Sequence, residues 1–245
     1  MPRAKAPPET LSESVAQYVV DYVRVHQLKS GETVPSELRI SSELGVSRGI
    51  VREAYRTLKT AGIIDIANGR APRVAKITDS AIVQLLEHAV STEQARIRHI
   101  LDLRVGIEVN GAEMAARNRK AEHVSALIDH VDKMQTSLDN PRRFVSNDIA
   151  FHQTIAEATG NPLLELMVRA MRKSLAASMQ SVFRNWKERS DQDQIVRTHR
   201  RIAEAICDRD PVEASRSMKL HFDEAFISLA GGSASSAGSR GKGRK

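Results

Sequence analysis

Four residues in the second half of the chain carry side chains that could together hold a metal ion. Asp148 and His152 are four residues apart on a predicted helix, so both project from one face. His199 and His221 fall near corresponding places in two later predicted helices. A carboxylate and three imidazoles suit Zn, Ni, Fe and related ions and leave positions open for a further ligand. The same spacing also fits polar surface residues or buried histidines satisfied by hydrogen bonds.

A second informative group is cationic and begins just after Ser47. On a helix, its members fall within about 80° of one another, opposite an apolar face; they are Arg48, Arg52, Arg56 and Lys59. A major groove admits a helix whose first turns meet base edges, so arginines there are typical of DNA reading. A solvated basic surface is the alternative, but seven cations against two acids between residues 48 and 76 favour DNA.

The elements that must position these residues divide the chain in two. Gly and Pro cluster before residue 75, and long segments with apolar residues three and four apart follow. We expect a disordered tail over 1–9, a DNA-binding domain over 10–76, an all-helical domain over 80–230 and a disordered basic tail over 231–245. The fold class is therefore mostly α.

The first domain is predicted to hold three helices and a small hairpin. The helices are expected over 11–27, 36–44 and 47–61, with Gly45 as a left-handed stop and Ser47 as an N-cap. Two β-prone stretches, 63–66 and 73–75, flank Asn68-Gly69, a dipeptide that favours a tight turn. The second domain is predicted to hold helices over 81–90, 93–118, 121–138, 142–159, 162–185, 191–208 and 211–230.

Composition narrows the function class and the location. The net charge is +7, but most of the excess lies in the two tails, so the global charge alone is weak support for DNA binding. The single cysteine, Cys207, excludes an intrachain disulfide. No apolar run approaches the ~20 residues that span a bilayer, and the N-terminus lacks a signal-peptide core. We expect a soluble, cytoplasmic protein without membrane contact.

Residues 10–76 resemble the winged helix-turn-helix of GntR regulators, whose usual pattern is close to PSE-x-x-x-x-x-x-LGVSR-x-x-VREA. The chain has Pro35-Ser36-Glu37, then Leu44 to Arg48, then Val51 to Ala54 at these places. The resemblance implies that Arg48 and Arg52 contact an operator, with Ser47 close to the DNA backbone and a wing near the minor groove. The set of expected DNA-binding residues is Arg39, Ser47, Arg48, Arg52, Arg56, Gly69, Arg70 and Arg73.

The chain departs from that pattern in two places. Many family members have Arg directly after PSE, whereas this chain has Leu38 there and Arg39 one place later. The usual wing ending, Gly-x-Gly-x-Phe-Val, is replaced by Gly69-Arg70-Ala71-Pro72-Arg73-Val74. These departures put an Arg39 contact in doubt and predict a more cationic wing of different shape.

Residues 80–230 resemble the helical effector domain of the FadR branch of GntR regulators, the FCD type. The markers are Leu103-Arg104-x3-Glu108, Asp148-x2-Phe151-His152, Gly160-Asn161-Pro162, His199-x2-Ile202-x2-Ala205-Ile206 and His221. In metal-binding members, one Asp and three His hold a divalent ion that receives a small carboxylate. The resemblance implies that Asp148, His152, His199 and His221 are the ligands. It makes Arg104 a candidate partner of the effector carboxylate, with a bond to Asp148 or Glu108 as the alternative.

Together these features predict a homodimeric, non-enzymatic transcription regulator, more specifically a repressor that a small organic acid releases from a palindromic operator. Two alternatives stay open at this stage. A three-His, one-Asp site could activate water in a metal-dependent hydrolase, although no base or oxyanion donor is evident beside it. A basic helix could also belong to a nonspecific architectural DNA binder.

Overall fold

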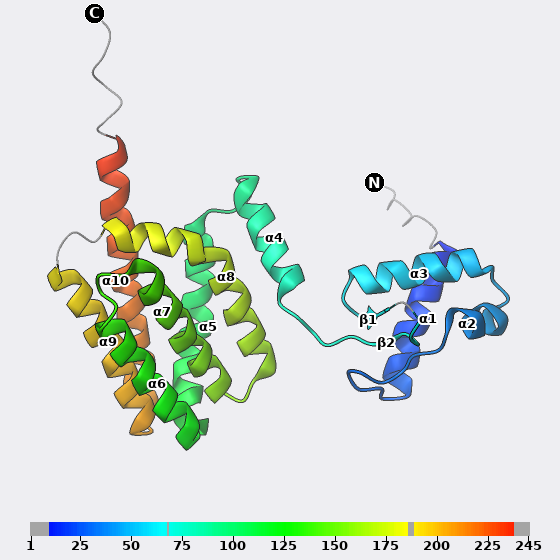
Figure 1. Ribbon diagram of the computed structural model, residues 1–245, viewed down its shortest axis with the longest axis horizontal. Helices are drawn as coiled ribbons and strands as arrows, with labels where there is room; N and C mark the ends of the chain where they lie inside the picture. Colours follow the sequence, from blue (N-terminus) through cyan, green and yellow to red (C-terminus); the bar gives the residue numbers. More distant parts are fainter. Residues whose placement is uncertain (1–9, 68, 186–188, 238–245) are drawn as a thin grey trace, which may run out of the picture. The chain divides into compact units, whose positions relative to one another are not determined.

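The computed structural model describes residues 10–67, 69–185 and 189–237 (Figure 1). The chain divides into two compact units between Ala81 and Ile82. The first unit contains the only described strands, and the second is all helical, so the predicted fold class is confirmed. The predicted N-terminal tail, Asn68 of the predicted turn and residues 238–245 lie outside the described residues.

The first unit is a three-helix cluster with a two-stranded sheet. Its elements are α1 (Leu11–Val25), α2 (Glu37–Leu44), α3 (Arg48–Thr60), β1 (Ile64–Asp65) and β2 (Arg73–Val74). The strands are antiparallel, with Ile64 opposite Val74, and Thr33 makes an additional bridge to Arg73. A hairpin wing thus follows α3 and is tied back to the segment before α2.

Local sequence explains where these helices begin and end. Thr10 and Glu13 form a reciprocal capping box at the start of α1. Ser36 and Ser47 cap α2 and α3 by accepting the backbone N–H group three residues further on. Gly45 ends α2 with a φ of 66°, a left-handed conformation that favours glycine and lets the chain turn into α3.

A small core joins the three helices to the sheet. It consists of Val15, Val19, Val34, Ile40, Val51, Ala54, Tyr55, Leu58 and Ile64. Tyr55 is also a polar anchor, because its buried hydroxyl donates to the Pro35 carbonyl oxygen over 2.6 Å. This bond fixes α3 against the segment that leads into α2.

Replacing Tyr55 with phenylalanine tests that anchor. The ring still fills the core, but the Pro35 carbonyl loses its donor, so we expect Tyr55→Phe to lower the free energy of unfolding of the first unit by about 1 kcal/mol. Tyr18→Phe is a matched control, because the Tyr18 hydroxyl bonds Glu43 at the exposed surface. Urea titration of both variants measures the difference, and equal losses would contradict a special role for Tyr55.

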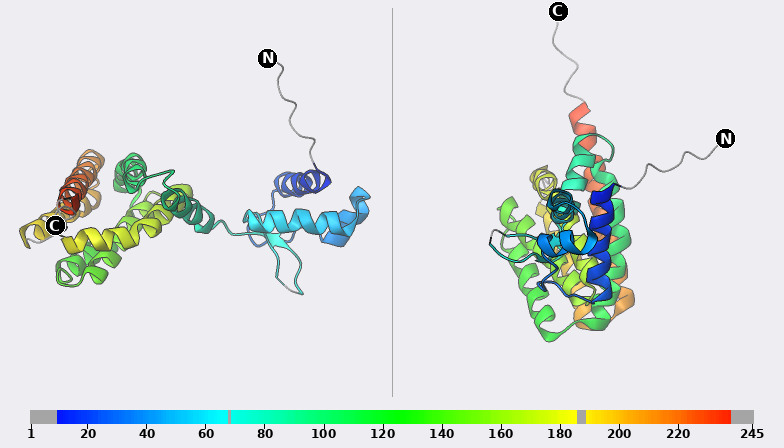
Figure 2. Two further views of the ribbon diagram at one scale, coloured as in Figure 1. Left: turned by 90° about the horizontal axis from the view of Figure 1, so that it is seen from above. Right: turned by 90° about the vertical axis from the view of Figure 1, so that its right-hand side faces the viewer.

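The second unit is a helical bundle. Its helices are α4 (Ser80–Ser91), α5 (Ile97–Asn118), α6 (Ala121–Gln135), α7 (Pro141–Ala158), α8 (Pro162–Asn185), α9 (Arg189–Cys207) and α10 (Pro211–Ala237). Helix α10 packs against α5 and α9, and α7 packs between α6 and α8 (Figures 1 and 2). No helix in the described ranges combines the length and apolar character that a bilayer crossing requires.

Two helix boundaries differ from the sequence prediction by four residues or more. Helix α5 begins at Ile97 rather than residue 93, because Glu93 has a φ of 59° and interrupts helical geometry after α4. Helix α10 continues to Ala237, although a disordered tail was expected from residue 231. The Gly231-Gly232 pair that motivated that boundary lowers helix propensity, but alanines and serines beyond it are compatible with further turns.

Candidate metal centre and nucleic-acid interface

Helix α3 presents one cationic face and one apolar face. Val51, Ala54 and Leu58 are buried, whereas Arg48 and Arg56 are exposed. Arg52 is also exposed and lies on that outer face, where its Nε is 3.4 Å from Glu37 Oε2 of α2. An exposed pair of this kind contributes little stability, so it does not prevent Arg52 from exchanging its partner for DNA.

The remaining expected DNA-binding residues are distributed over three elements. Ser47 serves as the N-cap of α3. Arg39 lies 3.6 Å from Glu43 and over the Tyr22 ring at 5.8 Å, so it is partly held by its own unit. In the wing, Gly69 has a φ of 73°, and Gly69 and Arg70 are exposed. Arg73 donates to the Gly31 carbonyl oxygen over 2.7 Å, which fixes the base of the wing.

The four residues proposed as metal ligands meet in the interior of the helical unit. Asp148 and His152 come from α7, His199 from α9 and His221 from α10. All four are buried, and one ligand atom from each lies within 4.8 Å of the others. Three helices therefore bring one carboxylate and three imidazoles to a single place.

The hydrogen-bond partners of two imidazoles show which nitrogen faces the cluster. His199 Nδ1 is 2.8 Å from the Ile195 carbonyl oxygen, which can only accept, so Nδ1 must carry the proton. The Nε2 of a neutral His199 is then a lone pair, yet it lies 2.9 Å from Asp148 Oδ1. Two acceptors at this distance require a shared proton or a cation.

His152 repeats this arrangement. Its Nδ1 lies 2.6 Å from Glu108 Oε2, a hydrogen-bonding distance although the approach is not in line with the ring N–H. Its Nε2 is 3.7 Å from Asp148 Oδ1 and has no hydrogen-bond partner in the described part of the chain. His221 Nδ1 is likewise buried without one. The donor set and its unsatisfied nitrogens fit a divalent cation.

Burial also sets the protonation states that such a site needs. It lowers the pKa of His152 to about 4 and lowers the pKa of His221 well below its ordinary value, with neighbouring imidazoles adding to the second shift. Burial acts to raise the pKa of Asp148, but the Arg172 guanidinium overcomes this effect and holds it well below the usual range. At neutral pH His152 and His221 are thus neutral and Asp148 is ionised.

A chain of buried ion pairs extends from the cluster. Arg172 Nη1 donates to Asp148 Oδ2 over 2.5 Å, and its Nη2 lies 3.4 Å from Glu108 Oε2. Arg104 Nε donates to Glu108 Oε1 over 2.6 Å. Burial alone would raise the pKa of Glu108, but the two arginines hold it well below its usual value. Two cations and two anions therefore balance one another beside the imidazoles.

The sequence analysis missed Arg172, although a signal was present. Arg172 lies four residues after Val168 and three before Leu175, both buried, and is itself fully buried. A cation in the apolar stripe of a helix requires a buried anion, and this pattern could have identified it. The other histidines, His26, His88, His99, His123 and His130, lie outside the four-residue cluster.

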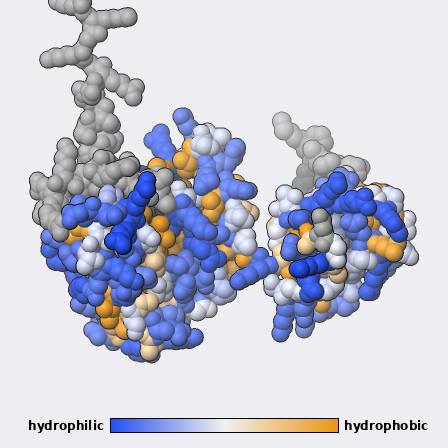
Figure 3. Space-filling model, in the orientation of Figure 1, coloured by the Kyte–Doolittle hydropathy of each residue, from blue (hydrophilic) through white to orange (hydrophobic). Residues whose placement is uncertain are grey.

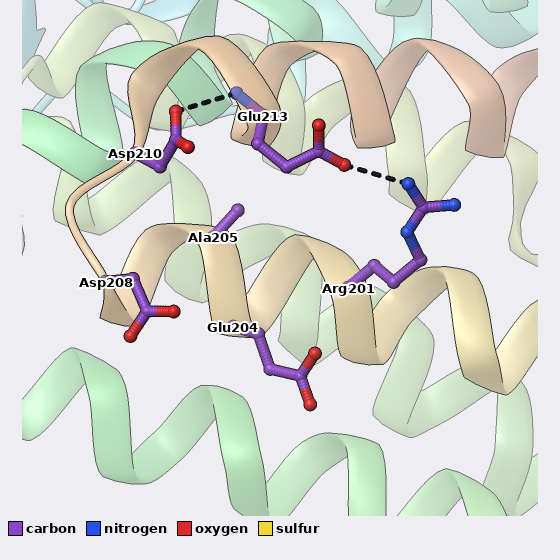
Figure 4. A pocket seen from close by; sticks show the side chains of 6 residues that line it. All are labelled: Arg201, Glu204, Ala205, Asp208, Asp210 and Glu213. Atoms are coloured by element: carbon purple, nitrogen blue, oxygen red, sulfur yellow. Dashed lines mark hydrogen bonds and ion pairs between the residues drawn. The ribbon is translucent and has the colours of Figure 1, made fainter.

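A surface pocket lies between α9 and α10 (Figure 4). Its volume is about 230 Å³, and it is lined by Arg201, Glu204, Ala205, Asp208, Asp210 and Glu213. Arg201 binds Glu213 over 2.9 Å, and Asp210 accepts the Glu213 backbone N–H at the start of α10. The first contact pairs α9 with α10, and the second caps the start of α10.

Both units match known protein families. Residues 11–74 match the model for bacterial regulatory proteins of the gntR family, and residues 99–224 match the FCD domain. The chain belongs to the gntR family. This regulator is 30% identical over 220 residues to the HTH-type transcriptional repressor NanR of Salmonella schwarzengrund, covering 87% of this chain and 82% of that protein. NanR of Salmonella newport is also 30% identical, with 83% of its length covered.

A solved structure gives independent support for the fold. Streptococcus agalactiae GntR aligns with a TM-score of 0.65 at 20% identity, covering 89% of this chain and 99% of that one. The matches confirm the predicted family, its FCD-type helical domain and a ligand-responsive DNA-binding transcription regulator, and they support repression. They do not favour a hydrolase or an architectural DNA binder.

Proposed function

We propose that this regulator is a homodimeric, cytoplasmic repressor that a small carboxylate releases from a palindromic operator. The observation that carries the proposal is the buried convergence of Asp148, His152, His199 and His221 in a chain that also presents a cationic recognition helix. The first feature provides a sensor, and the second provides a reader of DNA. Relatives named as repressors support the sign of regulation.

The proposed operator contacts follow from the exposed face of α3. Arg48, Arg52 and Arg56 would enter the major groove, with Ser47 at the backbone. Arg70 and Arg73 would place positive charge near an adjacent groove, with Gly69 allowing the turn between them and β1. Arg39 would contact the operator only peripherally, because its pairing with Glu43 competes with DNA.

The proposed effector site adjoins the metal ligands. A divalent ion held by Asp148, His152, His199 and His221, such as Zn or Ni, would supply a Lewis-acidic centre with positions open to a carboxylate. Arg104 supports the anionic character of the ligand, because its buried Nη2 has no hydrogen-bond partner among the residues that the structure describes, while its Nε is bound to Glu108. Arg104 could therefore bind Glu108 and an effector carboxylate at the same time, since one guanidinium has donors for both.

Homodimerisation is supported by apolar side chains that the described chain leaves uncovered. Helix α4 is rich in apolar residues but buries none of them fully. Leu85 of α4 is 66% exposed, and Leu103 of α5 is 53% exposed. Figure 3 shows apolar surface interrupting the polar covering of the helical unit on the face drawn. A second copy would bury this surface and supply the second recognition helix that a palindrome requires.

The Arg73 contact provides a test of the wing. A wing cation is expected to meet phosphate, so Arg73→Ala should weaken binding to operator and random DNA alike and make the salt dependence of affinity shallower by about one unit in slope. Because Arg73 also bonds Gly31, circular dichroism must show that the unit stays folded. A loss confined to one base pair of the operator would contradict a phosphate role.

The proposed function as a whole is tested by selecting genomic fragments that bind the protein and then screening small organic acids for release. We expect a palindromic fragment bound at least about a thousandfold more tightly than random DNA, and its release by a carboxylate. Equal affinity for all fragments would contradict operator recognition. Hydrolysis of ester or amide substrates by metal-loaded protein, lost in Asp148→Ala, would instead indicate an enzyme.

A further inference from the structure

Glu108 occupies a central position in the buried network of the helical unit. It lies in the middle of α5 and is 3% exposed. Three donors from three different helices approach its two carboxylate oxygens: Arg104 Nε at 2.6 Å, His152 Nδ1 at 2.6 Å and Arg172 Nη2 at 3.4 Å. An ion pair with Arg104 alone would need only one of these approaches.

The contact with His152 determines what the other nitrogen of that ring can do. A neutral imidazole carries one proton, and a carboxylate beside Nδ1 retains the proton there. Nε2 is then an acceptor, buried 3.7 Å from Asp148 Oδ1 without a hydrogen-bond partner among the described residues. Nδ1 approaches Glu108 Oε2 to 2.6 Å, a distance at which a small rotation of the ring would align its N–H with the carboxylate. The Ile195 carbonyl holds His199 in the same tautomer by a different contact.

Glu108 is thus placed to act on the ligand set without belonging to it. It is not among the four residues whose ligand atoms converge. Its carboxylate faces the guanidinium groups of Arg104 and Arg172, which can only donate to it, at 2.6 and 3.4 Å. Outer carboxylates that orient ligating histidines contribute substantially to metal affinity in proteins.

We propose that Glu108 is a positioning residue that holds His152 as the Nδ1–H tautomer and thereby aims its Nε2 lone pair at the metal site. This inference rests on the proposed metal function. In this proposal the Glu108 carboxylate on α5 orients His152 on α7 and also holds Arg104 in place through their ion pair. The tautomer and the metal affinity can be measured separately.

The test uses Glu108→Gln in the full-length protein, with Glu113→Gln as the matched control. Glutamine keeps the size of the side chain but has one acceptor oxygen, so its amide NH₂ must face at least one of the three donors. Glu113 is on the same helix and pairs with Arg117 at the same four-residue spacing over 2.6 Å, but at the surface. Only the first substitution alters the surroundings of His152.

Two readouts are needed. Long-range proton–nitrogen NMR of metal-free protein with isotope-labelled histidine should show His152 as the Nδ1–H tautomer in the wild type and in Glu113→Gln, and a mixture or the opposite tautomer in Glu108→Gln. Competition with a chromophoric chelator should show Zn²⁺ bound about 10- to 100-fold more weakly by Glu108→Gln. Circular dichroism of the metal-free proteins monitors folding.

An unchanged His152 tautomer in Glu108→Gln, or an unchanged Zn²⁺ affinity, would overturn the proposal. Should Glu108→Gln not fold, Arg104→Gln with Glu108→Gln removes one charge of each sign, and the same two measurements apply to that double variant. Failure of the wild type to bind Zn²⁺ would overturn the proposed metal centre itself. The NMR result would then still show whether Glu108 selects the tautomer.

Discussion

Chelation of the bound divalent ion is expected to lower the melting temperature of the helical unit by roughly 8–16 °C. An ion present at a thousand times its Kd stabilises the folded state by ~4 kcal/mol, and ~1 kcal/mol shifts the melting of a domain of this size by about 2–4 °C. The ligands come from α7, α9 and α10, so the ion would connect these three helices directly. The first unit supplies none of them and should melt unchanged.

A histidine substitution gives the same test without a chelator. His221→Ala should remove most of the bound metal, as measured by elemental analysis, and should abolish the effect of chelation on melting. His130→Ala is a matched control, because His130 is a partly buried histidine of the same unit outside the cluster. Stoichiometric metal in purified His221→Ala, or wild-type melting that does not respond to chelation, would show that the histidines are structural.

Loss of operator preference is the second large effect, and it is expected in Arg48→Ala combined with Arg52→Ala. Each lost bidentate contact to a base costs ~1–3 kcal/mol, so the two together should reduce the preference for operator over random DNA by roughly 30-fold to more than 10,000-fold if they act independently. Both side chains lie on the exposed face of α3, so the fold should persist.

Fluorescence anisotropy with operator and random duplexes at one salt concentration measures that ratio. Arg24→Ala is the control, because Arg24 is an exposed cation of α1 that pairs with Asp21. The control should lower neither affinity by more than a small factor. An unchanged operator-to-random ratio in the double variant would contradict the assignment of α3 as the reading helix.

Periodicity and capping residues were sufficient to predict most of the fold. The α3 prediction was accurate because Ser47 caps it and an apolar stripe through Val51, Ala54 and Leu58 defines its buried face. Helix ends were harder to predict where the sequence has no residue that strongly favours helix termination. Glu93 takes a left-handed conformation that its residue type does not announce, and α10 continues past two glycines.

The candidate ligand set could be proposed because two of its members share a helix face, but the partners that complete the site could not. Asp148 to Arg172 and Glu108 to His152 are contacts between helices, and single-residue spacing does not encode which helices pack together. Arg104 and Glu108 are four residues apart on α5, so their ion pair lies within one helix; the sequence allowed this pair but left it open against a bond to Asp148 or to an effector. In the structure Arg104 Nε pairs with Glu108, and its Nη2 has no hydrogen-bond partner among the described residues.

The central claim is that ligand binding at the buried Asp/His cluster controls operator binding. The most direct test is the operator affinity of metal-loaded protein with and without the carboxylate found by screening, measured in parallel for wild type and His152→Ala. The account predicts that the carboxylate weakens wild-type binding by about 5- to 150-fold, the usual range of allosteric coupling, and leaves the operator affinity of His152→Ala unchanged. An equal response in both proteins would contradict it, because the effector would then act without the metal centre.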